Sequence, residues 1–194
     1  YAGKKFLKKK NFILVNRKKD LKFNYLKKVN PKYIFFPHWS FKVEKKITDN
    51  FNCIGFHTGN LPFEKGGSPI QNLIKRNRSK TYVNALKLNN KIDGGDILLK
   101  KKIFLSGNLE KILNNISIII SQMIKLIIQN KFKKIKQKNK GSSFKRITSN
   151  KLNKNEKFSS NKLYNLIRMR DAEEYEKTYL KFSNLKIELS NARL

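Results

Sequence analysis

Short apolar runs alternate with amphipathic segments along most of the chain, and this alternation constrains the fold more than any other feature of the sequence. Buried strands are predicted at residues 12–16, 33–37, 52–56 and 80–88, and after the Gly-rich turn at 93–95. Helices are predicted at residues 20–30, 41–51, 68–77 and 109–132. Strands that alternate with helices predict an α/β fold, a Rossmann-like, mostly parallel sheet with helices on both faces.

The composition changes after the longest predicted helix. Residues 135–160 are rich in Lys, Asn and Ser, which predicts a polar linker. Residues 161–194 contain a helical pattern at 163–170 followed by strand-like segments, which predict a small C-terminal subdomain. The chain is therefore divided into a main domain at residues 1–134, the linker, and this subdomain.

The charge of the chain is extreme. Lys and Arg total 45 against 13 Asp and Glu, a formal net charge of +32. Such an excess is typical of proteins that bind a polyanion such as RNA, DNA or an acidic membrane. The lysines are scattered rather than clustered, and Asn is abundant too, which favours compositional drift toward residues with A/T-rich codons as the main cause. The charge should still attract phosphorylated substrates.

The single cysteine, Cys53, rules out a disulfide framework and is compatible with a cytoplasmic location. No secretory signal is evident at the start of the sequence. The best candidate for a membrane span, residues 116–128, is too short and includes Lys125, so no membrane partner is expected. The sequence indicates no metal ligands and leaves the oligomeric state open.

Gly and Pro are concentrated in one stretch, GFHTGNLPFEKGGSPIQ at residues 55–71, directly after a predicted strand. Ligands of α/β sheets bind beyond the carboxyl ends of strands, so this loop is placed at the functional edge. His57 lies in this loop, and Asp93 lies in the Gly-rich turn between two predicted strands. At neighbouring carboxyl ends the carboxylate could orient the imidazole and favour its charged form for acid–base catalysis. The alternative is a structural histidine and an ordinary turn aspartate.

The run FHTGNLPFEKGGSPIQNLI resembles the signature loop of the folate-dependent formyltransferases, approximately N-x-H-x-S-L-L-P-x-x-R-G-x-x-P-I-Q. The later segment LKLNNKIDGGDILLK is similar to the family's M-x-x-x-x-D-x-G-x-I-L. The resemblance covers about residues 33–193. It implies the formyltransferase fold in residues 1–134, with the first strand–helix unit of the family missing, and a small C-terminal appendage.

The resemblance implies that His57 stabilises an oxyanion and that Asp93 keeps His57 protonated and helps take a proton from an attacking amine. The family's asparagine two residues before the histidine is replaced by Gly55. We expect Asn60 to supply the missing donor, with Thr58 as the other polar candidate. Residues expected to line the pocket for 10-formyltetrahydrofolate are Phe36, Pro37, Leu61, Pro62, Gly66 and Asp96.

The resemblance implies transfer of a formyl group from the co-substrate 10-formyltetrahydrofolate to a primary amine. Only about thirty-five residues follow the linker, too few for the five-stranded barrel of a tRNA-binding domain. We therefore expect a small phosphorylated or nucleotide-linked amine as acceptor, most plausibly an amino-sugar nucleotide. The alternative that the charge favours is methionyl-tRNA. A non-catalytic basic binding module on a degenerate scaffold and hydrolysis of the folate to formate are further alternatives.

Overall fold

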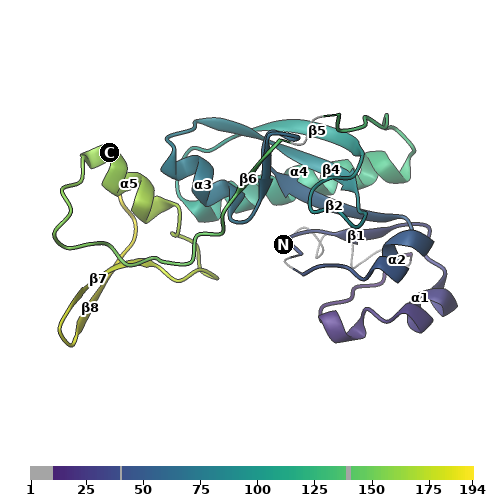
Figure 1. Ribbon diagram of the computed structural model, residues 1–194, viewed down its shortest axis with the longest axis horizontal. Helices are drawn as coiled ribbons and strands as arrows, with labels where there is room; N and C mark the ends of the chain where they lie inside the picture. The colour runs from purple at the N-terminus through teal and green to yellow at the C-terminus, as the bar shows by residue number, and fades with distance from the viewer. Residues whose placement is uncertain (1–10, 40, 139–140) are drawn as a thin grey trace.

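The computed structural model describes residues 11–39, 41–138 and 141–194 (Figure 1). The central sheet has the strand order β1-β2-β4-β5, and two further pairs are β3 with β6 and β7 with β8. The strands are β1 (Ile34–Phe36), β2 (Cys53–Thr58), β3 (Glu64–Gly66), β4 (Lys80–Lys87), β5 (Ile97–Phe104), β6 (Ser142–Phe144), β7 (Thr178–Phe182) and β8 (Leu185–Leu189). The helices are η2 (Lys18–Asp20), α1 (Phe23–Val29), α2 (Lys45–Asn50), α3 (Pro69–Lys75), α4 (Leu109–Ile128) and α5 (Ser160–Arg168).

The central sheet is mixed. β1 pairs with β2 in parallel, whereas β4 is antiparallel to both β2 and β5. The α/β class is confirmed, but the described strands do not form the mostly parallel sheet expected from the sequence. β4 and β5 are joined by residues 88–96 without a helix, and a connection this short forms a hairpin rather than a parallel crossover.

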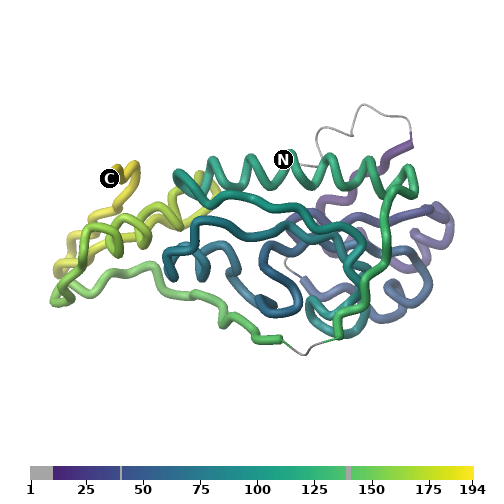
Figure 2. Tube along the Cα trace, turned by 90° about the horizontal axis from the view of Figure 1, so that it is seen from above, coloured from purple at the N-terminus to yellow at the C-terminus, as the bar shows by residue number. Residues whose placement is uncertain are grey.

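Helices cover both faces of the sheet, as predicted. α4 packs on one face, in a cluster that includes Ile54, Val83 and Ala85. Cys53 lies in a second cluster, with apolar residues from α1 and α2, on the opposite face. Neighbouring residues of a strand point to opposite faces, which is why Cys53 and Ile54 fall in different clusters. Figure 2 shows α4 running along one side of the sheet.

By length and composition alone, α4 could cross a membrane, with a mean hydropathy of 1.4. Its buried side chains recur every three or four residues and face β4 and β5, whereas Lys125 and the rest of the opposite face are exposed. This is the pattern of an amphipathic core helix. The helix begins after Asn108, whose side chain accepts a hydrogen bond from the Lys111 N–H, and ends at Ile128 rather than at residue 132.

Outside the central sheet, the structure differs from the sequence expectation in two places. Residues 12–16 form no strand: Ile13 and Leu14 are exposed, and Phe12 packs on the main core. Residues 135–160 are more than a polar linker, because β6 lies in this range and pairs in parallel with β3.

The C-terminal region joins the main core through α5 and the turn that follows it. Met169 and Ala172 belong to the main cluster, and Arg168 donates hydrogen bonds to the backbone oxygens of Leu105 and Gly107. The β7–β8 hairpin projects away from the central sheet (Figure 1). The main apolar cluster contains residues from before and after residue 161. The predicted domain boundary at this residue therefore stays a prediction. The helix predicted at 163–170 is α5, which begins earlier, at Ser160.

Candidate active site

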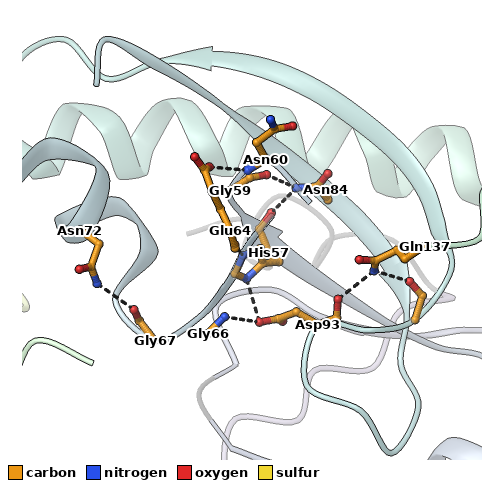
Figure 3. Close-up of polar contacts among 11 residues, drawn as sticks. His57, Gly59, Asn60, Glu64, Gly66, Gly67, Asn72, Asn84, Asp93 and Gln137 are labelled. Atoms are coloured by element: carbon orange, nitrogen blue, oxygen red, sulfur yellow. Dashed lines mark hydrogen bonds and ion pairs between the residues drawn. The ribbon is translucent and has the colours of Figure 1, made fainter. Parts of the chain in front are cut away.

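His57 lies near the end of β2 and points to the face of the sheet opposite α4. Its side chain is 7% exposed. Nδ1 lies 3.4 Å from Oδ2 of Asp93, and Nε2 lies 2.6 Å from the backbone oxygen of Glu64 (Figure 3). A carboxylate and a carbonyl are both acceptors, so both contacts can be hydrogen bonds at once only when both ring nitrogens carry a proton. The geometry thus suits the charged imidazole.

Asp93 reaches His57 by a route that differs from the sequence expectation. Because β4 runs antiparallel to β2, Lys87 at the end of β4 pairs with Ile54 near the start of β2. The two side chains therefore do not meet at a shared carboxyl edge of parallel strands. The loop of residues 88–96 instead folds back over the sheet and carries Asp93 to His57.

The turn that contains Asp93 is held on several sides. Asp93 itself has a left-handed backbone, with φ at 48°. Its Oδ2 accepts a hydrogen bond from the N–H of Gly66 at 2.9 Å. The amide of Gln137 donates to the backbone oxygens of Asp93 and Gly95 at 2.8 and 2.7 Å. A Cβ on Gly95 would lie 1.6 Å from the backbone oxygen of Lys87, so only glycine permits this approach.

The loop between β2 and β3 is held by two side chains. Oε2 of Glu64 accepts a hydrogen bond from the N–H of Asn60 at 2.6 Å. Asn84, fully buried in β4, donates to the backbone oxygens of His57 and Gly59 at 3.2 and 2.6 Å. Because Asn84 is directly paired with His57 across the sheet, it fixes the backbone at the point where the strand becomes the loop.

Asn60 does not face His57 in this structure. Its Oδ1 accepts a hydrogen bond from Nζ of Lys100 at 2.7 Å, and Figure 3 shows the Asn60 amide pointing away from the imidazole. Burial lowers the pKa of Lys100, and the carboxylate of Glu64 works against this shift. The role of Asn60 as an oxyanion donor stays a prediction, and it requires the side chain to leave Lys100 and turn toward the histidine.

Leu88 occupies the space beside Gly55. A Cβ at residue 55 would lie 2.6 Å from Cδ2 of Leu88. The asparagine of the family pattern would therefore meet Leu88, the first residue after β4. Thr58, the other polar candidate, follows His57 in β2 and points to the opposite face of the sheet. The structure thus brings no carboxamide or hydroxyl to His57 from positions 55 and 58.

Two of the residues expected to line the folate pocket have side chains in the core. Phe36 is 5% exposed and Leu61 is 2% exposed, and each belongs to an apolar cluster. Both side chains therefore pack in the core, and a place for these residues in a folate pocket stays a prediction.

The other four residues expected at this pocket lie in loops or at their ends. Pro37 and Pro62 are half-buried in the loops after β1 and β2. Gly66 contacts the Asp93 carboxylate directly. Asp96 closes the same turn, because its backbone oxygen accepts a hydrogen bond from the N–H at the end of β4.

The sequence did not indicate Asn84 and Gln137, which hold the backbone at His57 and Asp93, or Lys100, which holds Asn60 and the backbone of Leu61. A polar residue inside an apolar strand is a signal that could have identified Asn84, because a buried amide needs partners. No local pattern marks Gln137, which lies in a stretch where nearly every residue is polar.

The arrangement of these side chains defines a class of protein. An imidazole between a carboxylate and a carbonyl can donate to a developing negative charge and can move a proton. On an α/β scaffold under a Gly-rich loop, this is a candidate site for group transfer by acid–base catalysis.

Comparisons with known proteins identify the family. The family model for the methionyl-tRNA formyltransferase C-terminal domain matches residues 148–194. The methionyl-tRNA formyltransferase from Clostridium thermocellum is 36% identical, covering 100% of this chain and 87% of that chain with a TM-score of 0.92. The chain therefore belongs to the formyltransferase family that includes methionyl-tRNA formyltransferase.

More distant and shorter matches agree with this assignment. An N-formyltransferase from Helicobacter canadensis in complex with folinic acid and dTDP-3-aminofucose shares the fold, with 23% identity, a TM-score of 0.59 and coverage of 79% of this chain and 59% of that chain. A curated methionyl-tRNA formyltransferase from Caldicellulosiruptor saccharolyticus is 32% identical over 88 residues, 44% of this chain and 28% of the relative. Matches to the first curated relatives span about a third of their length, 28% to 36%.

Proposed function

We propose that this protein transfers a formyl group from 10-formyltetrahydrofolate to the primary amine of methionyl-tRNA. The observation that carries the reaction type is the contact of 3.4 Å between the His57 ring and the Asp93 carboxylate. The family membership supports the folate-derived donor, because formyl transfer is the reaction that its named members share.

In the proposed formyl transfer, His57 and Asp93 have separate roles. When bound, 10-formyltetrahydrofolate would supply the formyl carbon and leave as tetrahydrofolate. His57 would donate from Nε2 to the formyl oxygen as the amine nitrogen bonds to the formyl carbon and negative charge develops on that oxygen. With Asp93 it would pass the proton lost by the amine to the leaving nitrogen, so that one C–N bond replaces another and no net proton is consumed.

His57 can bind the formyl oxygen of 10-formyltetrahydrofolate only if its present contact with Glu64 is released. Nε2 of His57, the nitrogen that would face the formyl oxygen, is bonded to the backbone oxygen of Glu64. A carbonyl oxygen of the donor has the same hydrogen-bonding character as that backbone oxygen, so it can take the same place. The proposal therefore requires the backbone at Glu64 to move away from the ring when the donor binds.

Three observations favour methionyl-tRNA over the amino-sugar nucleotide expected from the sequence. The sugar-nucleotide expectation depended on the small size of the C-terminal region, and that region matches the methionyl-tRNA formyltransferase C-terminal domain. The relative that bears this name is 36% identical, against 23% for the protein bound to an amino-sugar nucleotide. A net charge of +32 also suits an RNA substrate, and a cytoplasmic location remains part of the proposal.

Release of tetrahydrofolate by the purified protein tests the proposal. Methionyl-tRNA, the same tRNA without methionine, and a panel of amino-sugar nucleotides are supplied in parallel, with His57→Ala as the control. Release that requires both methionyl-tRNA and His57 is the expected result. Release that requires an amino-sugar nucleotide would overturn the acceptor and keep the reaction, and release without any amine would indicate hydrolysis.

A further inference from the structure

Gln137 reaches the His57–Asp93 pair from a stretch that the sequence assigned to the polar linker. Residues 135–138 and 141–147 are called here the crossing segment. Near its start, Ile135 exchanges two backbone hydrogen bonds with Ile97, each 2.9 Å long. Further on, β6 pairs with β3, the strand that follows the His57 loop. The crossing segment therefore contacts the Asp93 turn with one part and the His57 loop with the other.

The orientation of the Gln137 amide is fixed by its partners. Both are backbone oxygens, of Asp93 at 2.8 Å and of Gly95 at 2.7 Å, so the amide nitrogen must face them (Figure 3). The other end of the amide, Oε1, is buried and has no hydrogen-bond partner among the described residues. A buried oxygen without a donor is unfavourable. The amide nitrogen of Gln137 thus donates two hydrogen bonds while the amide oxygen accepts none. This asymmetry indicates that the side chain acts through its donor end.

The two bonds act on a turn that needs support. Asp93 has φ at 48°, in the left-handed region that non-glycine residues rarely adopt. The contact between Asp93 and His57 is already long, at 3.4 Å, so a small outward shift of the turn would break it. Among the described residues, Gln137 is the side chain that donates to the backbone oxygen of Asp93.

We propose that Gln137 is a positioning residue, which holds the Asp93 turn so that the carboxylate stays against Nδ1 of His57. The expected effect of Gln137 on the rate of formyl transfer rests on the proposed function, whereas its expected effect on the His57–Asp93 contact does not. Gln137 touches neither reacting atom and acts through the turn.

Two substitutions separate positioning from packing. Gln137→Met keeps the length and nearly the volume of the side chain but removes the donor, while also removing the unsatisfied oxygen. Gln137→Asn keeps the donor on a shorter stem, which can retain one of the two bonds. Positioning predicts that methionine is worse than asparagine, and packing predicts the reverse. Gln129→Met, an exposed glutamine just after α4, is the matched control.

The first measurement requires no turnover. In protein labelled with ¹⁵N-histidine, the Nδ1–H signal of His57 is observed when its bond to Asp93 shelters the proton from exchange, and His38→Gln assigns it because the chain has 2 histidines. The signal is expected in the unsubstituted protein and in Gln129→Met, weaker in Gln137→Asn, and absent in Gln137→Met. An undiminished signal in Gln137→Met would overturn the proposal.

The second measurement is formyl transfer with methionyl-tRNA. Gln137→Met is expected to lower kcat about tenfold to a hundredfold, as a displacement of about 1 Å does, with KM for the tRNA unchanged. Its melting temperature should change by at most about 3 °C. A larger loss in Gln137→Asn than in Gln137→Met would show a packing role and overturn positioning. If the unsubstituted protein transfers no formyl group but Gln137→Met still loses the signal, the proposed function fails and the positioning role stands.

Discussion

Nε2 of His57 lies 2.6 Å from the backbone oxygen of Glu64, so the N–H that an incoming carbonyl would need is already bonded within the chain. The same glutamate braces its own loop, because Oε2 accepts from the Asn60 N–H at 2.6 Å and lies 3.4 Å from the Thr81 hydroxyl. Backbone and side chain of one residue therefore both hold the loop in a closed arrangement.

Removing the carboxylate of Glu64 should loosen this loop. Glu64→Ala deletes a hydrogen bond between a charged acceptor and a partly buried N–H, and such bonds contribute about 2 kcal/mol. The free energy of unfolding should fall by about this amount, and the amides of residues 59–64 should exchange with deuterium faster. Urea unfolding and hydrogen exchange measure the two effects. Glu173→Ala, at an exposed glutamate, is the control and should change neither; equal effects of both substitutions would contradict the bracing role.

Asp93→Asn should lower the rate of formyl transfer while the fold is kept. The asparagine can still accept the hydrogen bond from the Gly66 N–H through its oxygen, but it carries no charge to balance a protonated His57 ring and cannot take up a proton. The expected loss in kcat is about 10²- to 10⁴-fold, the usual contribution of acid–base catalysis. Release of tetrahydrofolate measures the rate, and an unchanged melting temperature shows that the fold is intact. A rate close to that of the unsubstituted protein would remove Asp93 from the mechanism.

Local sequence patterns predicted most of the elements but not the direction of the strands. The apolar runs at β1, β2, β4 and β5 were located correctly, because burial shows in composition. Direction depends on how the connections cross the sheet, which the alternation of strands and helices does not determine. Apolar content alone does not make a strand, because a strand also requires backbone pairing, and the run at residues 12–16 forms none.

At the site, the sequence identified His57 and Asp93 but not what holds them. Their identity is local, because each lies in a Gly-rich motif with a recognisable spacing. The bonds from Asn84 and Gln137 join residues 25 to 44 positions apart, and only the folded chain brings such residues together. Asn60 is near His57 in sequence, but the loop turns its amide toward Lys100, an orientation that the sequence does not indicate; its role as a donor stays a prediction.

Restoring the asparagine of the family pattern should raise activity only if Leu88 is made smaller. In Gly55→Asn the new side chain meets Leu88, whose Cδ2 lies 2.6 Å from the position of the Cβ. Gly55→Asn with Leu88→Ala has room for the amide beside His57. This double variant should exceed Leu88→Ala alone in kcat by about tenfold to a hundredfold, somewhat below the usual contribution of an oxyanion donor.

The comparison must be made against Leu88→Ala, because this substitution removes apolar contacts and should cost about 2 kcal/mol of stability. Turnover numbers are therefore corrected for the folded fraction, measured by urea unfolding. A double variant no faster than Leu88→Ala would show that the site does not use a carboxamide donor at position 55.

Asp171 should make the stability of the C-terminal region sensitive to acid. The side chain is 5% exposed, and burial by itself would raise its pKa. Hydrogen bonds from the backbone N–H of Asn191 and from the side chains of Lys177 and Asn108, together with the charge of Lys177, outweigh burial and hold the pKa of Asp171 below its usual 3.8.

The sign of the pH effect follows from this lowered pKa. The unfolded chain binds the proton more readily than the folded chain, so the carboxylate stabilises the fold fully above the ordinary pKa of 3.8 and loses this contribution as the pH falls through the lower folded value. In urea unfolding, the difference in the free energy of unfolding between the unsubstituted protein and Asp171→Asn should be constant between about pH 5 and pH 6 and should shrink below the ordinary pKa.

Asp49→Asn is the control, because its ion pair with Lys45 is exposed and should contribute nothing measurable to stability. A difference for Asp171→Asn that stays constant down to about pH 2 would show that the folded and unfolded chains bind this proton equally well.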